Sequence, residues 1–221
     1  MLKENALKAV LLSWWNGFYV YEGDFAMGDK LQRCALAFQR LIDTQYEFII
    51  GRKGKTSRII LNFTETEFVH LAGLHKLVDN DFFRTASRKK VFDYALAGKI
   101  SYETLTKSEN FNFVKERIDY FEFLENMLDS NDIIFKYNEK KNVFSLIQAD
   151  YLLQSKHTGR DIYIFLDKIK NSDLHFCRSF FPKEDKDFTA GQTKYTLLYK
   201  KKTDKITGKS EIQYNRLPDK L

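Results

Sequence analysis

Hydrophobic residues repeat at helical spacing through much of the N-terminal half of the chain. Apolar side chains recur every three to four positions, which places them on one side of a helix, over Lys30–Asp43, Phe83–Ala97 and Phe111–Leu128. Another helix is expected to begin at Thr64, because Thr64 and Glu67 have the spacing of a capping box. Ser101 is expected to cap a further short helix.

Alternating and β-branched runs predict strands elsewhere. Tyr46–Ile50 and Arg58–Phe63, joined by the turn-forming Gly51–Gly54, predict a β-hairpin. Further strands are predicted at Ile133–Tyr137, Val143–Ile147, Tyr151–Gln154, Asp161–Leu166, His175–Phe181, Tyr195–Lys200 and Glu211–Tyr214, with Asn138–Asn142 turning the first pair. The run Ile162–Leu166 is apolar without alternation, as expected of a central strand that is covered on both faces.

Helices followed by a block of strands are typical of α+β domains rather than of alternating α/β folds. We therefore predict an α+β fold in which an N-terminal hairpin and helices precede an antiparallel β-sheet. Residues 1–26 are interpreted as an apolar N-terminal arm and residues 27–221 as one domain. The most apolar stretch, Ala9–Val20, is too short to span a bilayer and contains polar residues, so no membrane partner is expected.

Composition narrows the class of protein. Hydrophobic residues make up 43% of the 221 positions, which excludes a disordered chain, and two cysteines cannot build a disulfide framework or a four-cysteine zinc site. A reducing cytoplasm is the expected location. Residues 1–150 carry equal numbers of basic and acidic side chains, so the net charge of +6 lies entirely in residues 151–221. Such a surface favours a polyanion such as nucleic acid, although lysine-rich turns also serve solubility alone.

Several signatures of catalysis are missing from the sequence. It contains no glycine-rich phosphate loop, HExxH, paired CxxC or GxSxG, which argues against P-loop NTPases, zincins, zinc fingers and α/β-hydrolases. No metal or other cofactor is expected. The candidate chemistry therefore has to come from individual polar residues in apolar surroundings.

Arg117 is the first such residue. It falls in the middle of the apolar face that Val114, Phe121 and Leu128 form on the predicted helix. A guanidinium stays charged at any working pH, so an inward one must be paired or must line a cleft. A phosphate-binding cleft fits this position; a buried pair with a carboxylate, or a stem that extends to the surface, fits it as well.

His70 and His75 form the second candidate group. On one continuous helix they would project about 140° apart, which is not the spacing of a metal-binding pair. Imidazole exchanges a proton near neutral pH and suits an acid–base role, and a partly buried structural histidine is the alternative. Weaker candidates are Arg84 and Arg88 among apolar neighbours, Lys107 and Ser108 before the long helix, and Tyr195, Thr196, Lys200, Lys201 and Lys202 on a late strand.

At these positions the sequence resembles the fourth subfamily of the phage barnase–EndoU–colicin–RelE-like nucleases. The likeness rests on Leu61–Leu77 and, further along, on Lys107–Ser108, Arg117-Ile, Leu128-Asp-Ser-Asn, Ile134-Phe-Lys-Tyr-Asn, Ala149-Asp-Tyr-Leu-Leu, Ser179-Phe-Phe-Pro and Gln192–Lys200. It covers roughly residues 45–215 and leaves out residues 1–26. The resemblance implies helices before an antiparallel sheet, and metal-independent cleavage of RNA by proteins of phages and prophages.

The chemistry so implied is transesterification by the ribose 2′-OH. His70 and His75 are the candidates for proton transfer, Arg117 with Lys107 for charge stabilisation, and Ser108 and Thr196 for hydrogen bonds to phosphate. Arg84, Arg88, Tyr195 and Lys200–Lys202 are the candidates for binding nucleic acid. The expected partner is RNA, with tRNA and mRNA both open, and the protein is a candidate toxin or host-takeover factor with an antitoxin or immunity protein. A non-catalytic RNA- or protein-binding module on the same fold is the main alternative, and a structural phage protein is the weaker one.

Overall fold

The computed structural model describes residues 28–131, 133–142 and 145–217. The arm predicted over residues 1–26 lies outside these ranges. The helices are α2 (Lys30–Ile42), α3 (Glu67–Leu71), the 3-10 turn η1 (Leu74–Lys76), α4 (Asp81–Thr85), α5 (Arg88–Leu96), α6 (Tyr102–Thr106), α7 (Asn112–Phe121), α8 (Leu124–Ser130) and the 3-10 turn η2 (Glu139–Lys141). The strands are β1 (Thr44–Arg52), β2 (Lys55–Leu61), β3 (Ile133–Lys136), β4 (Tyr151–His157), β5 (Arg160–Lys168), β6 (Leu174–Pro182), β7 (Thr193–Asp204) and β8 (Ser210–Asn215).

Local sequence signals account for several of these boundaries. The carboxylate of Asp29 caps α2 by accepting from the amides of Leu31 and Gln32. The predicted hairpin is confirmed as β1–β2, and its turn is shorter than expected because Lys53 and Gly54 both adopt positive φ. The predicted cap at Ser101 is also confirmed, since Ser101 caps α6, and the structure adds a capping box with Thr104.

Two predicted long helices are each broken in two. The segment predicted as Phe83–Ala97 forms α4 and α5, because Ala86 is extended and Ser87 starts a new helix with its own side-chain cap. The segment predicted as Phe111–Leu128 forms α7 and α8. There, the amide of Phe123 bonds the carbonyl of Tyr120, which tightens the last turn of α7, and the ring of Phe123 stacks on His157 at 4.2 Å.

The helix expected from Thr64 begins three residues later, at Glu67. The Glu67 carboxylate accepts from the Thr64 amide and hydroxyl, but the Thr64 hydroxyl caps no backbone amide, so only the Glu67 half of the predicted capping box is formed. The helix also ends early, because Gly73 adopts a left-handed conformation with φ 78°. The chain then continues as η1 in a new direction.

Among the described residues, all eight strands belong to one sheet of order β1-β2-β6-β5-β4-β3-β7-β8. β1 also pairs with β7, so seven strands close into a barrel and β8 extends the free part of β7. The expectation of a simple antiparallel sheet was therefore wrong in two respects: the sheet is closed, and β2 pairs with β6 in parallel. Closure removes open edges that would otherwise expose unpaired backbone groups.

One predicted strand is not found. The described residues of Val143–Ile147, positions 145–147, form no strand, and positions 143 and 144 lie outside the described ranges. β3 therefore does not turn back through Asn138–Asn142 but pairs with β4 and β7. The partner of β3 is decided by barrel closure, a long-range arrangement that a local turn signal does not report.

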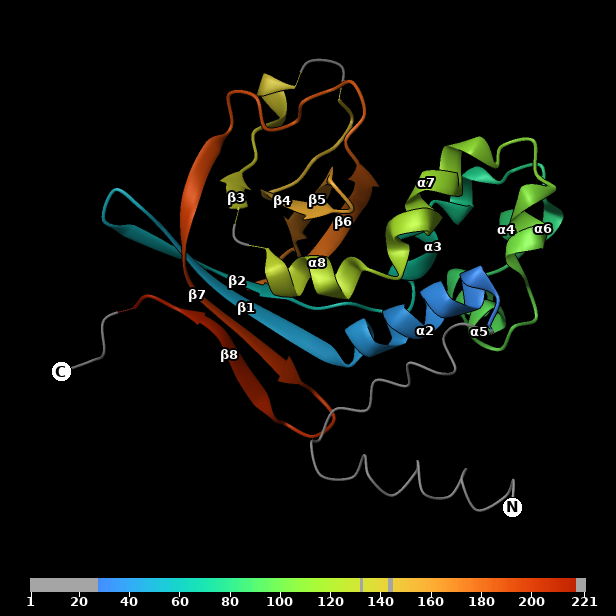
Figure 1. Cartoon of the computed structure of the whole chain (residues 1–221), viewed down its shortest axis with the longest axis horizontal. Coiled ribbons are helices and arrows are strands. Elements are labelled where there is room, and N and C mark those ends of the chain that lie inside the picture. Colours follow the sequence, from blue (N-terminus) through green and yellow to red (C-terminus); the bar gives the residue numbers. More distant parts are fainter. Residues whose placement is uncertain (1–27, 132, 143–144, 218–221) are drawn as a thin grey trace.

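Helices and sheet share one hydrophobic core. Figure 1 shows most helices gathered at one side of the sheet, with α8 beneath β3 and β4. The Phe38 and Phe68 rings lie 5.7 Å apart, and each lies 5.2–6.0 Å from the rings of Phe92 and Phe121; Phe121 also contacts Phe180 of β6. Ile162–Leu166 is fully buried in β5, with alternate residues in the main core and in a second aromatic cluster on the other face, so the prediction of a doubly covered strand is confirmed.

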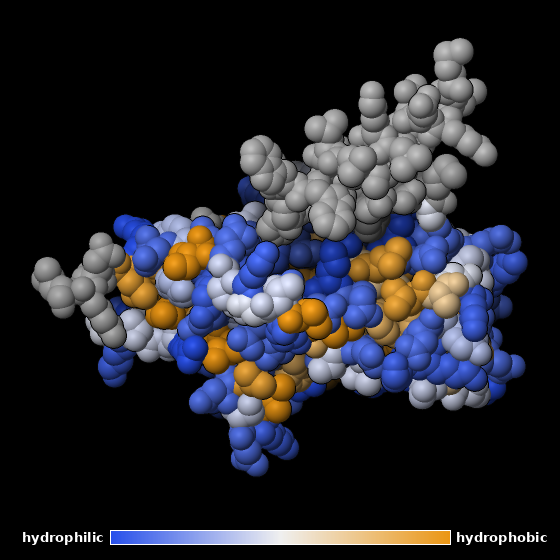
Figure 2. Space-filling model, turned by 90° about the horizontal axis from the view of Figure 1, so that it is seen from below, coloured by the Kyte–Doolittle hydropathy of each residue, from blue (hydrophilic) through white to orange (hydrophobic). Residues whose placement is uncertain are grey.

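The surface is predominantly polar on the face drawn in Figure 2, where hydrophobic residues form separate patches among hydrophilic ones. In the described part of the chain, no helix has the length and apolar character needed to cross a bilayer.

Candidate functional site

The break at Gly73 brings His70 and His75 together. Their rings stack with centroids 4.7 Å apart and planes 16° from parallel. A continuous helix would have separated them by about 140° around its axis, so the divergence expected from sequence was wrong. Gly73 permits this break because it adopts a positive φ, and its missing Cβ leaves room for Arg117, whose Cδ would lie 3.1 Å from such an atom.

Arg117 lies beside this pair, on α7. Its guanidinium stands 5.4 Å from the centre of the Phe181 ring, and Nη1 is 3.5 Å from the carbonyl oxygen of Leu71. Among the described residues, no carboxylate lies within ion-pair distance of it. The buried Arg–carboxylate pair that the sequence left open is therefore not the arrangement found.

His70, His75 and Arg117 line one cavity of about 340 Å³. Its other walls are Arg178 and Ser179 of β6 and the segment Leu146–Gln148. The site therefore lies where α3, η1 and α7 meet β6 (Figure 1). Every charged or titratable side chain that lines this cavity is an arginine or a histidine. The cavity therefore attracts an anion such as a phosphodiester.

The surroundings of both imidazoles favour the neutral form, most strongly at His70. Burial lowers the pKa of His70 to about 4, and the charges of His75 and Arg117 act in the same direction. Burial also lowers the pKa of His75, as does the charge of Arg117, while a hydrogen bond with the Val69 backbone opposes them. Burial lowers the pKa of Arg117 from its ordinary value, but a guanidinium remains charged at working pH. The cavity thus combines two imidazoles whose pKa values are lowered with two guanidinium groups, of which Arg178 is paired with Asp167.

Arg178 and Ser179 were not singled out as site residues by the sequence. Arg178 donates from Nε to the carbonyl of Gln148 at 3.2 Å and from Nη2 to Asp167 at 2.9 Å, which ties the segment over the cavity to β6. Ser179 is buried at 7% exposure. Its motif, Ser179-Phe-Phe-Pro, was the available signal, but only the pairing of β6 within the barrel directs it towards the two histidines.

Lys107, Ser108 and Thr196 do not line this cavity. Lys107 is exposed and pairs with Glu103 at 2.9 Å. Ser108 donates to the carboxylate of Asp79 at 2.6 Å, and Asp79 also accepts from the amide of Glu109. The carboxylate of Asp79 therefore occupies the place expected for an anion before the long helix. The hydrogen bond from Ser108 is the largest of those that lower the pKa of Asp79 to about 2. Thr196 is exposed on β7, opposite Ile133 of β3.

Three lysines of β7, Lys200–Lys202, are engaged within the protein. Lys200 is 3% exposed, and its ammonium donates to the carbonyls of Leu128, Asp129 and Asn131 at the end of α8. Lys201 pairs with Glu47 at 2.9 Å. Lys202 pairs with Glu125 and Asp129 at 2.9 and 2.8 Å. This segment therefore neutralises acidic groups of its own fold, and Lys200 is not placed to meet an external nucleic acid.

The other predicted binding residues are distributed between core and surface. Tyr195 packs against the hydrophobic core, and Arg84 pairs with Asp81 on the surface. Arg88 is exposed at the start of α5, and its positive charge contributes to the lowered pKa of His70 and His75. Arg88 is therefore the member of this group that lies near the candidate site.

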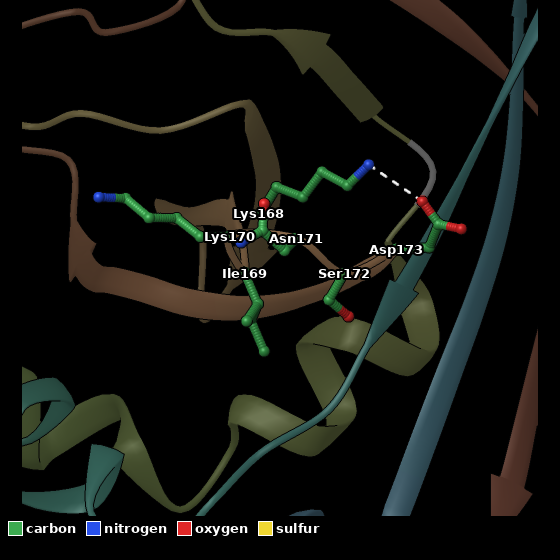
Figure 3. Close-up of a pocket in the computed structure, with 6 residues that line it drawn as sticks. All are labelled: Lys168, Ile169, Lys170, Asn171, Ser172 and Asp173. Carbon is green, nitrogen blue, oxygen red and sulfur yellow. Dashed lines mark hydrogen bonds and ion pairs between the residues drawn. The ribbon is translucent and has the colours of Figure 1, made fainter.

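A different hollow lies at the turn between β5 and β6, lined by Lys168–Asp173 (Figure 3). Lys168 and Lys170 point in opposite directions, and Lys168 pairs with Asp173 at 3.1 Å. Its side chains do not converge on a common point, in contrast to those of the imidazole cavity. In the described part of the chain, no three His, Cys, Asp or Glu side chains are grouped closely enough to hold a metal ion.

The comparisons with known proteins identify a family. A family model described as phage-Barnase-EndoU-ColicinE5/D-RelE like nuclease 4 matches residues 30–217. No curated protein and no solved structure matches the chain.

Proposed function

The chain belongs to this nuclease family, whose substrate is nucleic acid, and from that premise we propose that it is a metal-independent endoribonuclease acting at the cavity of His70, His75 and Arg117. The observation that carries the proposal is the stacked imidazole pair beside an arginine that has no carboxylate partner in the described ranges. Two proton-exchanging groups and a fixed cation can supply the base, the acid and the charge stabilisation that speed 2′-OH transesterification.

The proposed reaction begins with His70. In its neutral form it removes the proton of a ribose 2′-OH, and the oxygen attacks the adjacent phosphorus. A hydrogen bond with the Arg178 backbone occupies one ring nitrogen of His70 and leaves the other for this proton. His75 is more exposed, and its protonated form gives a proton to the departing 5′-oxygen. The products are a 2′,3′-cyclic phosphate and a free 5′-hydroxyl.

Arg117 stabilises the negative charge that develops on the phosphorane oxygens. Its guanidinium is held between the Phe181 ring and the Leu71 carbonyl, so little reorganisation is needed when the charge appears. Arg178 and Ser179 replace Lys107, Ser108 and Thr196 as the supporting residues of this proposal, because they line the same cavity.

The test is cleavage of a defined single-stranded RNA in EDTA, followed by analysis of the product ends. His70→Ala, His75→Ala and Arg117→Ala are each expected to lose at least about a hundredfold in kcat/KM. His157→Ala is the matched control, because this imidazole stacks on Phe123 outside the cavity. Undiminished cleavage in all three cavity variants, or cleavage of the same sequence as 2′-deoxy DNA, would refute the assignment. Binding without cleavage would instead indicate the non-catalytic module.

The cellular role follows as a second part of the proposal. The family description refers to phage proteins, which supports a phage or prophage origin and action on RNA in the bacterial cytoplasm as a toxin or host-takeover factor. Induced expression in a bacterial host should arrest growth with the wild type and not with Arg117→Ala at equal protein level. Rescue by a neighbouring gene product would identify the antitoxin or immunity partner.

A further inference from the structure

A second cavity adjoins the imidazole cavity. It has a volume of about 750 Å³ and shares the lining residues Arg117 and Ile147 with its neighbour, so the two hollows lie side by side; together we call them the groove. This volume lies within the range of about 300–1,000 Å³ that is typical of ligand sites. A chain bound with one phosphodiester at His70 and His75 would therefore have room for a neighbouring nucleotide beyond Arg117.

The walls of the second cavity are aromatic. Phe113, at the start of α7, is 64% exposed. Phe181 and Phe188 line the same hollow, with their rings 5.5 Å apart. A single exposed phenylalanine is ordinary on a protein surface. Phe113, however, lies in a groove that leads to a candidate phosphodiester site, and this position suits it to stack on an unpaired base.

Positive charge surrounds these rings. Four basic side chains line the cavity, namely Lys76, Lys115, Arg117 and Lys186, against the acidic Glu116 and Glu184. Glu116 is already paired with Arg160 at 2.9 Å. In the described part of the chain, neither Lys76 nor Lys115 has a carboxylate within ion-pair distance. The groove therefore retains an excess of positive charge that complements a phosphate backbone.

We propose that this second cavity is a subsite for the nucleotide next to the scissile phosphate, and that it selects single-stranded RNA. The base stacks on Phe113, and Lys76 and Lys115 neutralise the flanking phosphates. A duplex is excluded because its bases are already stacked on one another and cannot turn onto a protein ring. This inference rests on the proposed nuclease function, since it takes the imidazole cavity as the place of the scissile phosphate.

Binding is measured by fluorescence anisotropy with a labelled single-stranded 2′-O-methyl RNA hexamer, which lacks the attacking hydroxyl and stays intact. Phe113→Ala is expected to weaken binding on the order of tenfold, and Phe113→Trp to retain it. Val78→Ala is the matched control, since Val78 is 60% exposed and lies outside the groove. Lys115→Gln is expected to reduce the salt dependence of log Kd by about 0.7, whereas Lys209→Gln, outside the groove, leaves it unchanged.

The outcomes separate the subsite from the nuclease. His70→Ala should abolish cleavage of ordinary RNA and still bind the 2′-O-methyl hexamer with the same dependence on Phe113. If the wild type cleaves RNA while Phe113→Ala leaves both Kd and kcat/KM unchanged, the subsite is refuted and the nuclease stands. If binding depends on Phe113 and no RNA is cleaved, the second cavity binds single-stranded RNA, but the nuclease proposal fails and with it the assignment of a scissile phosphate. Equal competition by a 2′-O-methyl duplex would also overturn the subsite.

Discussion

The substitution Gly73→Ala is expected to destabilise the protein and to displace Arg117 from the imidazole cavity. Gly73 ends the turn after α3 with φ 78°, a conformation that costs a residue with a Cβ about 1–2 kcal/mol. The added methyl would also lie 3.1 Å from Cδ of Arg117 and 3.2 Å from Cγ1 of Val114. Val114 is fully buried whereas Arg117 is only partly buried, so we expect Arg117 to be the side chain that moves.

The free-energy cost of the steric contact can be separated from the cost of the backbone conformation. Overpacking of this kind costs about 1–3 kcal/mol, which brings the expected loss of unfolding free energy to about 2–5 kcal/mol. Gly54→Ala is the matched control, because Gly54 has nearly the same φ, 76°, and a methyl added there would meet nothing within 4 Å. It should lose only the backbone cost of about 1–2 kcal/mol.

Urea denaturation of both variants gives the two free energies, and RNA cleavage at a temperature where both remain folded gives kcat/KM. We expect Gly73→Ala to lose most of its activity and Gly54→Ala to retain it. Equal destabilisation in the two variants, or full activity in Gly73→Ala, would show that the close approach of Gly73 to Arg117 does not position the site.

Three further outcomes follow from the contacts and charges described above. Burial raises the pKa of Glu67 from 4.5 to about 7. The stability that the protonated Glu67 carboxyl contributes is therefore present at acid pH and is lost as pH rises from about 4.5 through about 7. Glu67→Gln should therefore stabilise the protein at pH 8 by on the order of 1–2 kcal/mol and leave it unchanged at pH 4, whereas a parallel shift at both pH values in urea denaturation would contradict this. Lys200→Met leaves carbonyls at the end of α8 without their donor and should lower the free energy of unfolding by about 2–4 kcal/mol, measured by thermal unfolding. Lys209→Met on the surface should change it by almost nothing. Similar losses in the two variants would be evidence against the structural role of Lys200. Cleavage should become faster as pH falls from 8 to 6, because the lowered pKa of His75 leaves little of the proposed acid protonated at pH 8, and a rate that rises with pH would exclude His75 from this role.

Local patterns in the sequence determined most of the secondary structure. The periodicity of Lys30–Asp43, the turn-forming residues between β1 and β2, the cap at Ser101 and the unbroken apolar run of β5 each depend on neighbours in the chain, and each was predicted. The inward position of Arg117 was also readable, because the face of a helix follows from residue spacing alone.

Only the tertiary structure decided how these elements combine. β1 closes on β7 and β3 pairs with β4 across long stretches of chain, since backbone hydrogen bonding is nearly indifferent to sequence and the final pairing depends on closure and burial. The same holds for the candidate site. The left-handed turn at Gly73 stacks His70 on His75, and β6 supplies Arg178 and Ser179 from another part of the chain. Residue type made these groups candidates, but the free energy of packing α3, α7 and β6 together determined which of them meet.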